Sequence, residues 1–302
     1  MKKPKSNFPK FMLLWAGELI SAVGSGLTSF GLGVYVFQQT ASAGSMALVT
    51  LLAVSDIKLL LVIDVCTFFP TVFAAAFVRK GIAARTADIK PHFGESLRQG
   101  WRTITGSRGI FILVAVSSLM TCFMGSFQIL AQPLILDFAD SATLGVGETI
   151  CASGMLVSSL FLGIKGIKRG YVKVLSAALF LAGLAMIGFG LWENIYPICL
   201  FGFLFFATLP FANNCLDYLV RTNIADELQG RAWGVIGFLS QIGYVVAYAV
   251  AGAAADGIAA RLDTGVGRGS AAVVILAGIL LAAIALTLYP IKSVRSLEET
   301  SC

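Results

Sequence analysis

Long apolar runs dominate this chain and restrict what it can fold into. A helix needs about 20 apolar residues to cross about 30 Å of hydrocarbon, and runs of that length recur along the sequence. Because the runs are continuous and do not alternate between polar and apolar residues, they predict helices and not the strands of a membrane barrel. The predicted spans are residues 11–37, 58–78, 109–136, 144–164, 171–191, 195–219, 231–255 and 271–290. We therefore predict an all-α, polytopic membrane helix bundle of about eight spans.

The composition agrees with a membrane protein and excludes several other classes. Charged residues make up 13% of the 302 residues, about half the ~25% of a soluble domain. The 57% of hydrophobic residues excludes disorder, and six scattered Cys do not form a disulfide framework. The net charge of +6 is spread between the apolar runs, so no basic domain for nucleic acid is expected.

The distribution of Lys and Arg predicts the orientation in the membrane. If the N-terminus lies in the cytosol and the spans alternate, 19 of the 22 basic residues fall on the cytosolic side, and only Lys58, Arg261 and Arg268 fall outside. Such a bias is the positive-inside signal. We therefore predict a multi-pass protein of the cell membrane with both termini cytoplasmic. No cleavable signal peptide is expected, because the first apolar run is too long for one.

One short apolar stretch does not fit the count of full spans. The apolar run at residues 44–54 is eleven residues long and ends where Ser55, Asp56 and Lys58 follow. Eleven helical residues rise about 16 Å, about half the thickness of the hydrocarbon layer. We interpret this stretch as a half-helix that lies at the outer interface or dips into the membrane. A re-entrant loop is the alternative.

The sequence offers no catalytic machinery. His92 is the single His, so neither a zinc site nor a Ser-His dyad can be built. No Gly-rich loop ends in Gly-Lys-Ser or Gly-Lys-Thr, as an ATP-hydrolysing loop would require. We expect no enzyme activity, no catalytic residue, no metal and no cofactor.

A weak internal repeat links the first and third predicted spans. At a constant offset of 101 residues, Gly24-Ser25 aligns with Gly125-Ser126, and three further small or aromatic positions also match. Internal repeats are common in transporters, so these two spans are predicted to be corresponding helices.

Three segments resemble the major facilitator superfamily, and in particular its drug-efflux permeases of the macrolide-exporter type. Residues 14–26 (LWAGELISAVGSG) resemble the first helix of that group, residues 63–68 (IDVCTF) its sixth helix, and residues 226–231 (DELQGR) its loop between helices ten and eleven. The resemblance implies two helix bundles with the substrate path between them. Residues 163–170 (GIKGIKRG) resemble the gating loop of the second bundle without its acidic residue, and the corresponding loop of the first bundle is absent.

The resemblance also predicts the domain organisation. Residues 1–78 would form a truncated N-terminal bundle that keeps helix one, a stub of helix two, and helix six, with the join near Val54-Ser55. Residues 79–108 would form a cytoplasmic linker, and residues 109–302 a C-terminal six-helix bundle. Helices two to five would be missing.

Helix one carries two stripes of different character. Glu18 lies about 10 Å into the hydrocarbon, where an ionisable group is costly unless it faces protein or water. It shares a face with Ser25 and Ser29, so we consider a proton or cation site there, with a protonated, hydrogen-bonded carboxyl as the alternative. Asp64 in the next span is a weaker candidate for coupling and is otherwise structural. The other stripe consists of small residues suited to close helix packing: Gly17, Ser21, Gly24, Thr28 and Gly31.

A second polar group lies near the cytoplasmic end of the span 195–219. Spacings of four place Asn213, Asp217 and Arg221 on one face, with Asn214 beside them and Arg231 in the following loop. This cluster is predicted to act as a gate or anchor, not as a substrate site. The lone Gln241 is predicted to make a helix–helix hydrogen bond.

The central linker contains one amphipathic segment. An apolar stripe is flanked by Arg98 and Arg102, and it consists of Phe93, Leu97, Trp101 and Ile104. The pattern predicts a helix at the cytoplasmic membrane surface, with the arginines near anionic headgroups. A solvated linker is the alternative.

Two functions follow from these observations. The resemblance implies export of a small-molecule substrate, such as a drug, by proton-coupled alternating access, with membrane lipid as surroundings and no nucleic acid. The alternative is a non-transporting remnant or accessory membrane protein that associates through helix one, for example as a homo-oligomer.

Overall fold

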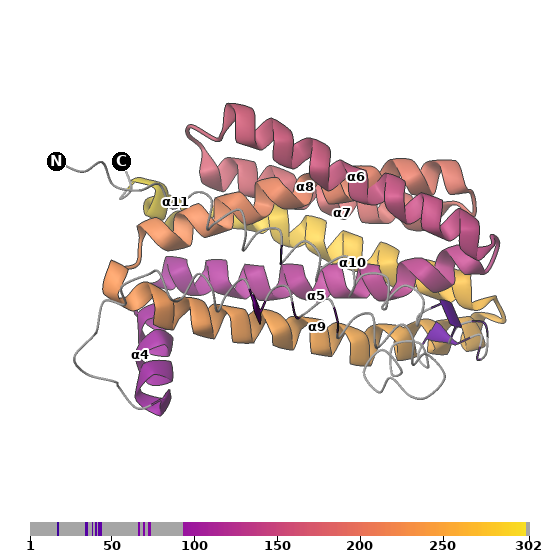
Figure 1. Ribbon diagram of the computed structural model, residues 1–302, viewed down its shortest axis with the longest axis horizontal. Coiled ribbons are helices and arrows are strands. Elements are labelled where there is room, and N and C mark those ends of the chain that lie inside the picture. The colour runs from indigo at the N-terminus through magenta and orange to yellow at the C-terminus, as the bar shows by residue number, and fades with distance from the viewer. Residues whose placement is uncertain are drawn as a thin grey trace. The chain divides into compact units, whose positions relative to one another are not determined.

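The computed structural model describes residues 93–299 without a break, and eleven residues before them: Gly17, Val34, Tyr35, Gln38, Thr40, Ser42, Ala43, Cys66, Phe69, Val72 and Phe73. The continuous part is all helix and loop (Figure 1). Its elements are α4 (Phe93–Gly106), α5 (Arg108–Leu136), α6 (Ser141–Lys165), α7 (Tyr171–Leu191), α8 (Ile195–Thr222), α9 (Asp226–Leu262), α10 (Val266–Leu288) and α11 (Lys292–Glu299).

Six of these helices, α5 to α10, are long and apolar enough to cross a membrane. They coincide with the six spans predicted after residue 108, so this part of the prediction is confirmed. The two earlier spans and the half-helix at 44–54 lie outside the described residues. Short turns separate the helices, and polar side chains in these turns cap the first turn of the helix that follows. The carboxylate of Asp140 accepts from the N–H of Thr143 at 2.9 Å before α6, and Asn194 accepts from Tyr196 N–H at 3.0 Å before α8.

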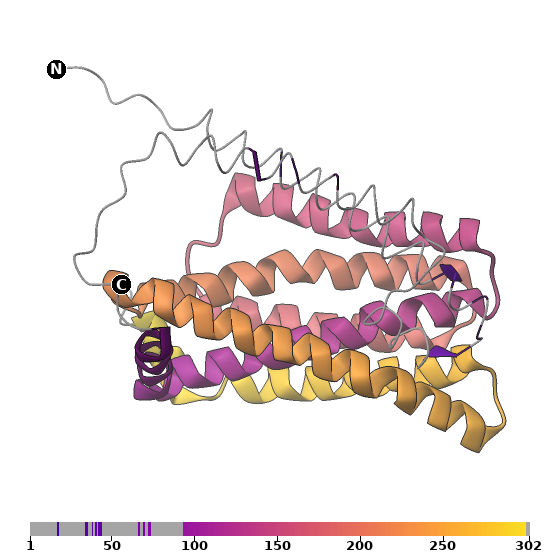
Figure 2. The same ribbon diagram turned by 60° about the horizontal axis from the view of Figure 1, so that its bottom comes forward.

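The most extensive contacts between the spanning helices join α7 with α10, α6 with α8, α7 with α8, and α5 with α9. Each pair joins a member of the first three helices to a member of the last three. Numbered within its half, the first helix pairs with the second, the second with the first and the third with the third, and the contact of α7 with α8 has a smaller counterpart in α10 with α5. Corresponding helices have two helices between them in the chain, so α5 and α8 run in opposite directions (Figure 2). This arrangement is an inverted repeat, an architecture typical of secondary transporters.

Small residues allow the closest of these contacts. A Cβ placed on Gly183 of α7 would lie 2.6 Å from the carbonyl oxygen of Gly278 on α10, and one on Gly278 would lie 2.6 Å from that of Gly183. A Cβ on Gly154 of α6 would overlap the carbonyl oxygen of Phe203 on α8. Backbone meets backbone at both crossings, which is how helices associate in lipid without a hydrophobic driving force.

Where α5, α7 and α8 meet, three aromatic rings fill the core. Phe127 lies 4.6 Å from Phe189 and 4.3 Å from Phe205 between ring centroids, and each side chain is at most 2% exposed. The rings contribute packing area and favourable edge and stacking contacts. They fix the rotation of three helices relative to one another.

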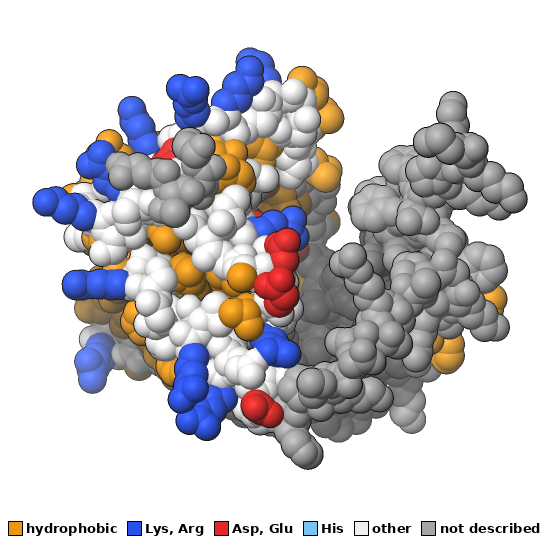
Figure 3. All heavy atoms as spheres, turned by 90° about the vertical axis from the view of Figure 1, so that its left-hand side faces the viewer, with side chains coloured by type: hydrophobic (Ala, Val, Ile, Leu, Met, Phe, Trp, Pro, Cys, Tyr) orange, Lys and Arg blue, Asp and Glu red, His pale blue; other side chains and the backbone are white. Residues whose placement is uncertain are grey.

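The two ends of the bundle differ in charge. The end where α5 begins and α10 ends, here called the basic end, carries eleven of the thirteen Lys and Arg of residues 93–299, and Figure 3 shows how they spread over this face. The opposite end carries Arg261 and Arg268, and Arg268 forms an ion pair with Glu193 across two turns. Among the described residues this is the one ion pair.

Two short helices close the basic end. The Glu298 carboxylate of α11 accepts from the N–H groups of Gly170, Tyr171 and Val172, at 3.0 Å for Tyr171 and 3.4 Å for Val172, and so caps α7 from a distance. Helix α4, in the predicted linker, packs on the start of α9, where Gly100 lies against the Arg231 backbone. The apolar residues predicted to share one face of α4 differ in burial. Ile104 is buried, whereas Leu97 and Trp101 are about half exposed, and Arg98 and Arg102 beside them are exposed.

The chain divides into two units by contacts: residues 1–40 with 49–90, and residues 41–48 with 91–302. The short segment of the second unit is held by α9. The Asp256 carboxylate accepts from the Ser42 hydroxyl at 2.7 Å and from the Ala43 N–H at 3.1 Å, and Ala43 is fully buried.

Candidate functional site

Polar side chains within the spanning helices are unevenly distributed. Away from the helix ends, α7 and α10 contain no Asn, Gln, Asp or Glu. The other four helices carry all eight: Gln128, Gln132, Glu148, Asn213, Asn214, Asp217, Gln241 and Asp256. Because polar groups in lipid are tolerated where they face protein or water, α5, α6, α8 and α9 mark the side of the bundle suited to a polar path.

The first predicted site lies mostly outside the described residues. Glu18, Ser25, Ser29 and Asp64 are among the undescribed positions, and so are the small residues Ser21, Gly24, Thr28 and Gly31. Gly17 is described, and it is helical and buried. The roles assigned to these residues stay predictions.

The second predicted site separates into two parts in the structure. Asn213, Asn214 and Asp217 are exposed on α8, and Arg221 is exposed one turn after Asp217. Arg231, by contrast, is half-buried on α9 and donates from its guanidinium to the Gln99 side-chain oxygen of α4. The structure therefore ties Arg231 to the linker helix and leaves Asp217 and Arg221 together on α8.

The turn between α8 and α9 is fastened by a residue that the sequence analysis did not single out. The Gln229 amide nitrogen donates to the carbonyl oxygens of Arg221 and Ile224 at 3.1 and 3.3 Å, and to Asp226 at 3.0 Å. From the first turn of α9, one side chain thus satisfies the Arg221 carbonyl near the end of α8 and the Ile224 carbonyl of the turn. Its place in the motif at 226–231 was the signal that could have identified it.

Among residues 93–299, Gln241 has no hydrogen-bond partner on another helix, contrary to the prediction. It is exposed on α9, and hydroxyl groups of α5 make the bonds at this level instead. Ser118 donates to the Leu239 carbonyl at 2.9 Å and Thr121 to the Ser240 carbonyl at 3.0 Å. Short hydroxyl side chains reach the backbone because Gly243 lets α5 and α9 approach closely.

A polar pair that the sequence analysis missed joins α5 to α6. The Gln132 amide nitrogen donates to the Glu148 carboxylate at 3.2 Å. Both residues are half-buried, and the Gln132 side-chain oxygen is buried without a hydrogen-bond partner. An acidic residue and a Gln in two otherwise apolar consecutive spans were the available signal.

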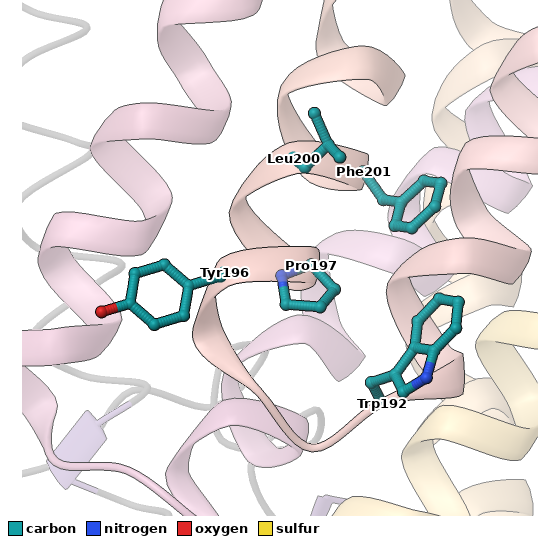
Figure 4. A pocket seen from close by; sticks show the side chains of 5 residues that line it. All are labelled: Trp192, Tyr196, Pro197, Leu200 and Phe201. Atoms are coloured by element: carbon teal, nitrogen blue, oxygen red, sulfur yellow. The ribbon is translucent and has the colours of Figure 1, made fainter.

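A shallow apolar pocket lies at the end opposite the basic one, on the turn between α7 and α8. Its volume is about 330 Å³, and it is lined by Trp192, Tyr196, Pro197, Leu200 and Phe201 (Figure 4). Trp and Tyr at this height are typical of the membrane interface. In the part of the chain that the structure describes, no group of three His, Cys, Asp or Glu side chains is arranged to hold a metal ion.

Comparison with known proteins points to one kind of relative. The chain is 23% identical to macrolide efflux protein A of Streptococcus pyogenes over 257 residues, which cover 82% of this chain and 60% of that protein. It is 22% identical to macrolide efflux protein A of Enterococcus faecalis over 164 residues, 52% of this chain and 50% of that protein. No family model and no solved structure matches.

The chain thus spans about 60% of the length of its Streptococcus pyogenes relative. The order of its helices, their inverted repeat and this similarity agree with one another. The chain is an all-α, multi-pass membrane protein similar to the macrolide efflux proteins of the major facilitator type.

Proposed function

We propose that this chain is an efflux carrier of the cell membrane that exports a small molecule by alternating access, driven by protons. The similarity to macrolide efflux proteins over 82% of the chain carries this proposal. It is supported by six spanning helices in an inverted repeat, with their polar residues restricted to four helices. In this proposal residues 109–302 form one bundle, residues 1–78 contribute the rest of the path, and residues 79–108 link the two.

The proposed orientation puts the basic end in the cytosol, together with both termini. Eleven basic residues at that end and two at the other are the bias that the positive-inside rule describes. Leu97 and Trp101 on α4 would then enter the cytoplasmic leaflet, with Arg98 and Arg102 at its anionic headgroups.

Two groups of residues would operate the carrier. In the first bundle, Glu18 with Ser25 and Ser29 would exchange the coupling proton, and Asp64 is a secondary candidate. At the cytosolic end, Asp217 and Arg221 on α8 would form part of the gate, together with Asn213 and Asn214. Arg231 would transmit its movement to α4 through Gln99, because these two side chains are hydrogen-bonded.

The second candidate function is that of a non-transporting remnant or accessory membrane protein that associates through the small residues of helix one. Such a protein would insert in the membrane and self-associate without lowering substrate accumulation.

Accumulation of a radiolabelled macrolide in susceptible bacterial cells distinguishes these functions. Cells that express the chain should accumulate less label than cells with an empty vector, and a protonophore should abolish the difference. Glu18→Gln should abolish export, whereas Ser21→Ala, in the packing stripe, should not. Equal accumulation in cells with the chain and with the vector, at matched membrane expression, would refute transport by this chain.

A further inference from the structure

The Gln132–Glu148 pair has the properties of a site that alternates between two protonation states. We propose that Glu148 takes up and releases a proton within the six-helix bundle, with Gln132 as the positioning residue that binds both forms of its carboxyl group. This inference rests on the proposed proton-driven function and adds a second coupling group to it, in the bundle that the structure describes.

One hydrogen-bond acceptor of the pair, the Gln132 side-chain oxygen, has no donor. Gln132 donates to Glu148 through its amide nitrogen at 3.2 Å, while its own carbonyl oxygen is buried without a partner. A buried acceptor without a donor is costly. A protonated Glu148 can supply the missing donor, because its O–H can bond to the Gln132 oxygen while its other oxygen still accepts from the Gln132 amide nitrogen. The same Gln side chain therefore suits the carboxylate as donor and the carboxylic acid as acceptor.

The charge balance around the pair also favours proton exchange. No Lys or Arg in residues 93–299 forms an ion pair with Glu148. Among the described residues, Glu148 interacts with the thiol of Cys151 on α6, which carries no positive charge. Asp137, directly after α5, lies against Gly265 and Gly267. An ionised carboxylate without a counter-ion is costly within the membrane, and binding a proton removes that cost.

The position of the pair fits access from the side opposite the basic end. Glu148 lies seven residues after the start of α6 and Gln132 four residues before the end of α5, which places them about 10 and 6 Å inside the helix ends. Glu148 is partly exposed, so a proton can reach it without unfolding the bundle. In the proposed orientation this is the outer side, from which an exporter driven by the proton gradient takes up its protons.

The step itself is a simple proton transfer. A proton from water forms an O–H bond with a carboxylate oxygen of Glu148, and the negative charge disappears. Release reverses the step. No covalent intermediate and no further reactant is needed.

Carbodiimide labelling tests this directly, without any transport measurement. Dicyclohexylcarbodiimide is apolar and reacts with protonated carboxyl groups. The full chain in liposomes would be treated with it from about pH 5 to about pH 9, and peptides would be mapped by mass spectrometry. We expect labelling at Glu148 that falls at least tenfold across this range and disappears in Glu148→Gln.

Two matched variants separate positioning from packing. Gln132→Leu should move the pH at which labelling is half complete, because the bound amide is lost. Gln128→Leu, one turn earlier on the same helix, should leave it unchanged. An unchanged midpoint in Gln132→Leu would overturn the positioning role.

Three outcomes would overturn the proposal: no labelling of Glu148 in the folded chain, labelling that does not vary with pH, or protection by Na⁺ at constant pH, which would indicate a metal cation instead of a proton. Because labelling needs no substrate, a chain that fails to export a macrolide but shows pH-dependent labelling would refute the proposed function alone.

Discussion

The crossing of α7 and α10 offers a sharp test of the packing. At this crossing Gly183 and Gly278 face each other, and a Cβ on Gly183 would lie 2.6 Å from the Gly278 carbonyl oxygen and 2.7 Å from the Ala282 nitrogen. Both atoms belong to the backbone and cannot turn aside. Gly183→Ala therefore forces the two helices apart.

The expected cost follows from these distances. The new Cβ would be about 0.8 Å closer than the 3.4 Å at which ordinary contacts begin, and separating two surfaces by that much loses a quarter to a half of their dispersion attraction. Overpacked sites lose about 1–3 kcal/mol, and the better helix propensity of Ala returns up to about 1 kcal/mol. We expect a net loss of about 1–2 kcal/mol in the free energy of unfolding.

Reversible unfolding in mixed detergent micelles, followed by circular dichroism, measures this loss. Gly163→Ala on α6 is the matched control, because no described atom lies within 4 Å of its added Cβ. That variant should be as stable as the parent protein or more stable. If Gly183→Ala were as stable as Gly163→Ala, the close backbone crossing would not exist.

Three further predictions concern the helix ends and the linker. Glu298→Ala should lower the free energy of unfolding by about 1 kcal/mol, since α7 loses its cap; urea titration measures it, and Glu298→Asp should retain part of the effect. Gln99→Leu should free α4 from α9 and speed proteolysis between residues 93 and 106, while Arg98→Gln should not. The Thr143 side chain and N–H lower the pKa of the Asp140 carboxyl. The contribution of Asp140 to the free energy of unfolding is therefore present at neutral pH and lost as the pH falls through the lowered pKa. If Asp140→Asn lost as much stability in acid as the parent protein, this prediction would be contradicted.

The bounds of the spans show what hydropathy can predict. The run 171–191 coincides with α7, and 109–136 differs from α5 by one residue. The run 231–255 is shorter than α9, which extends from Asp226 to Leu262. Hydropathy marks only the part of a helix that lies in hydrocarbon, whereas α9 continues past it at both ends and is tied there by Gln229 and Asp256.

The polar contacts show where prediction from the sequence fails. Arg231 was grouped with Asp217 and Arg221 because they are near in sequence, but its partner is Gln99, 132 residues away. Glu148 was overlooked because a lone acidic residue has no motif, and its significance depends on Gln132 of the preceding helix. Gln241 was expected to pair, yet its side of α9 is exposed.

The amino-acid sequence by itself determined that the chain is a helical membrane protein, how many membrane-spanning helices follow residue 108, and which end of them is basic. These properties depend on the thickness of the hydrocarbon layer and on the cost of charge within it, and both act on each segment separately. Only the tertiary structure decided which helices pair, that they form an inverted repeat, and that Gln132 and Glu148 meet. Those outcomes depend on how each helix is rotated about its axis, which contacts such as Gly183 with Gly278 determine jointly.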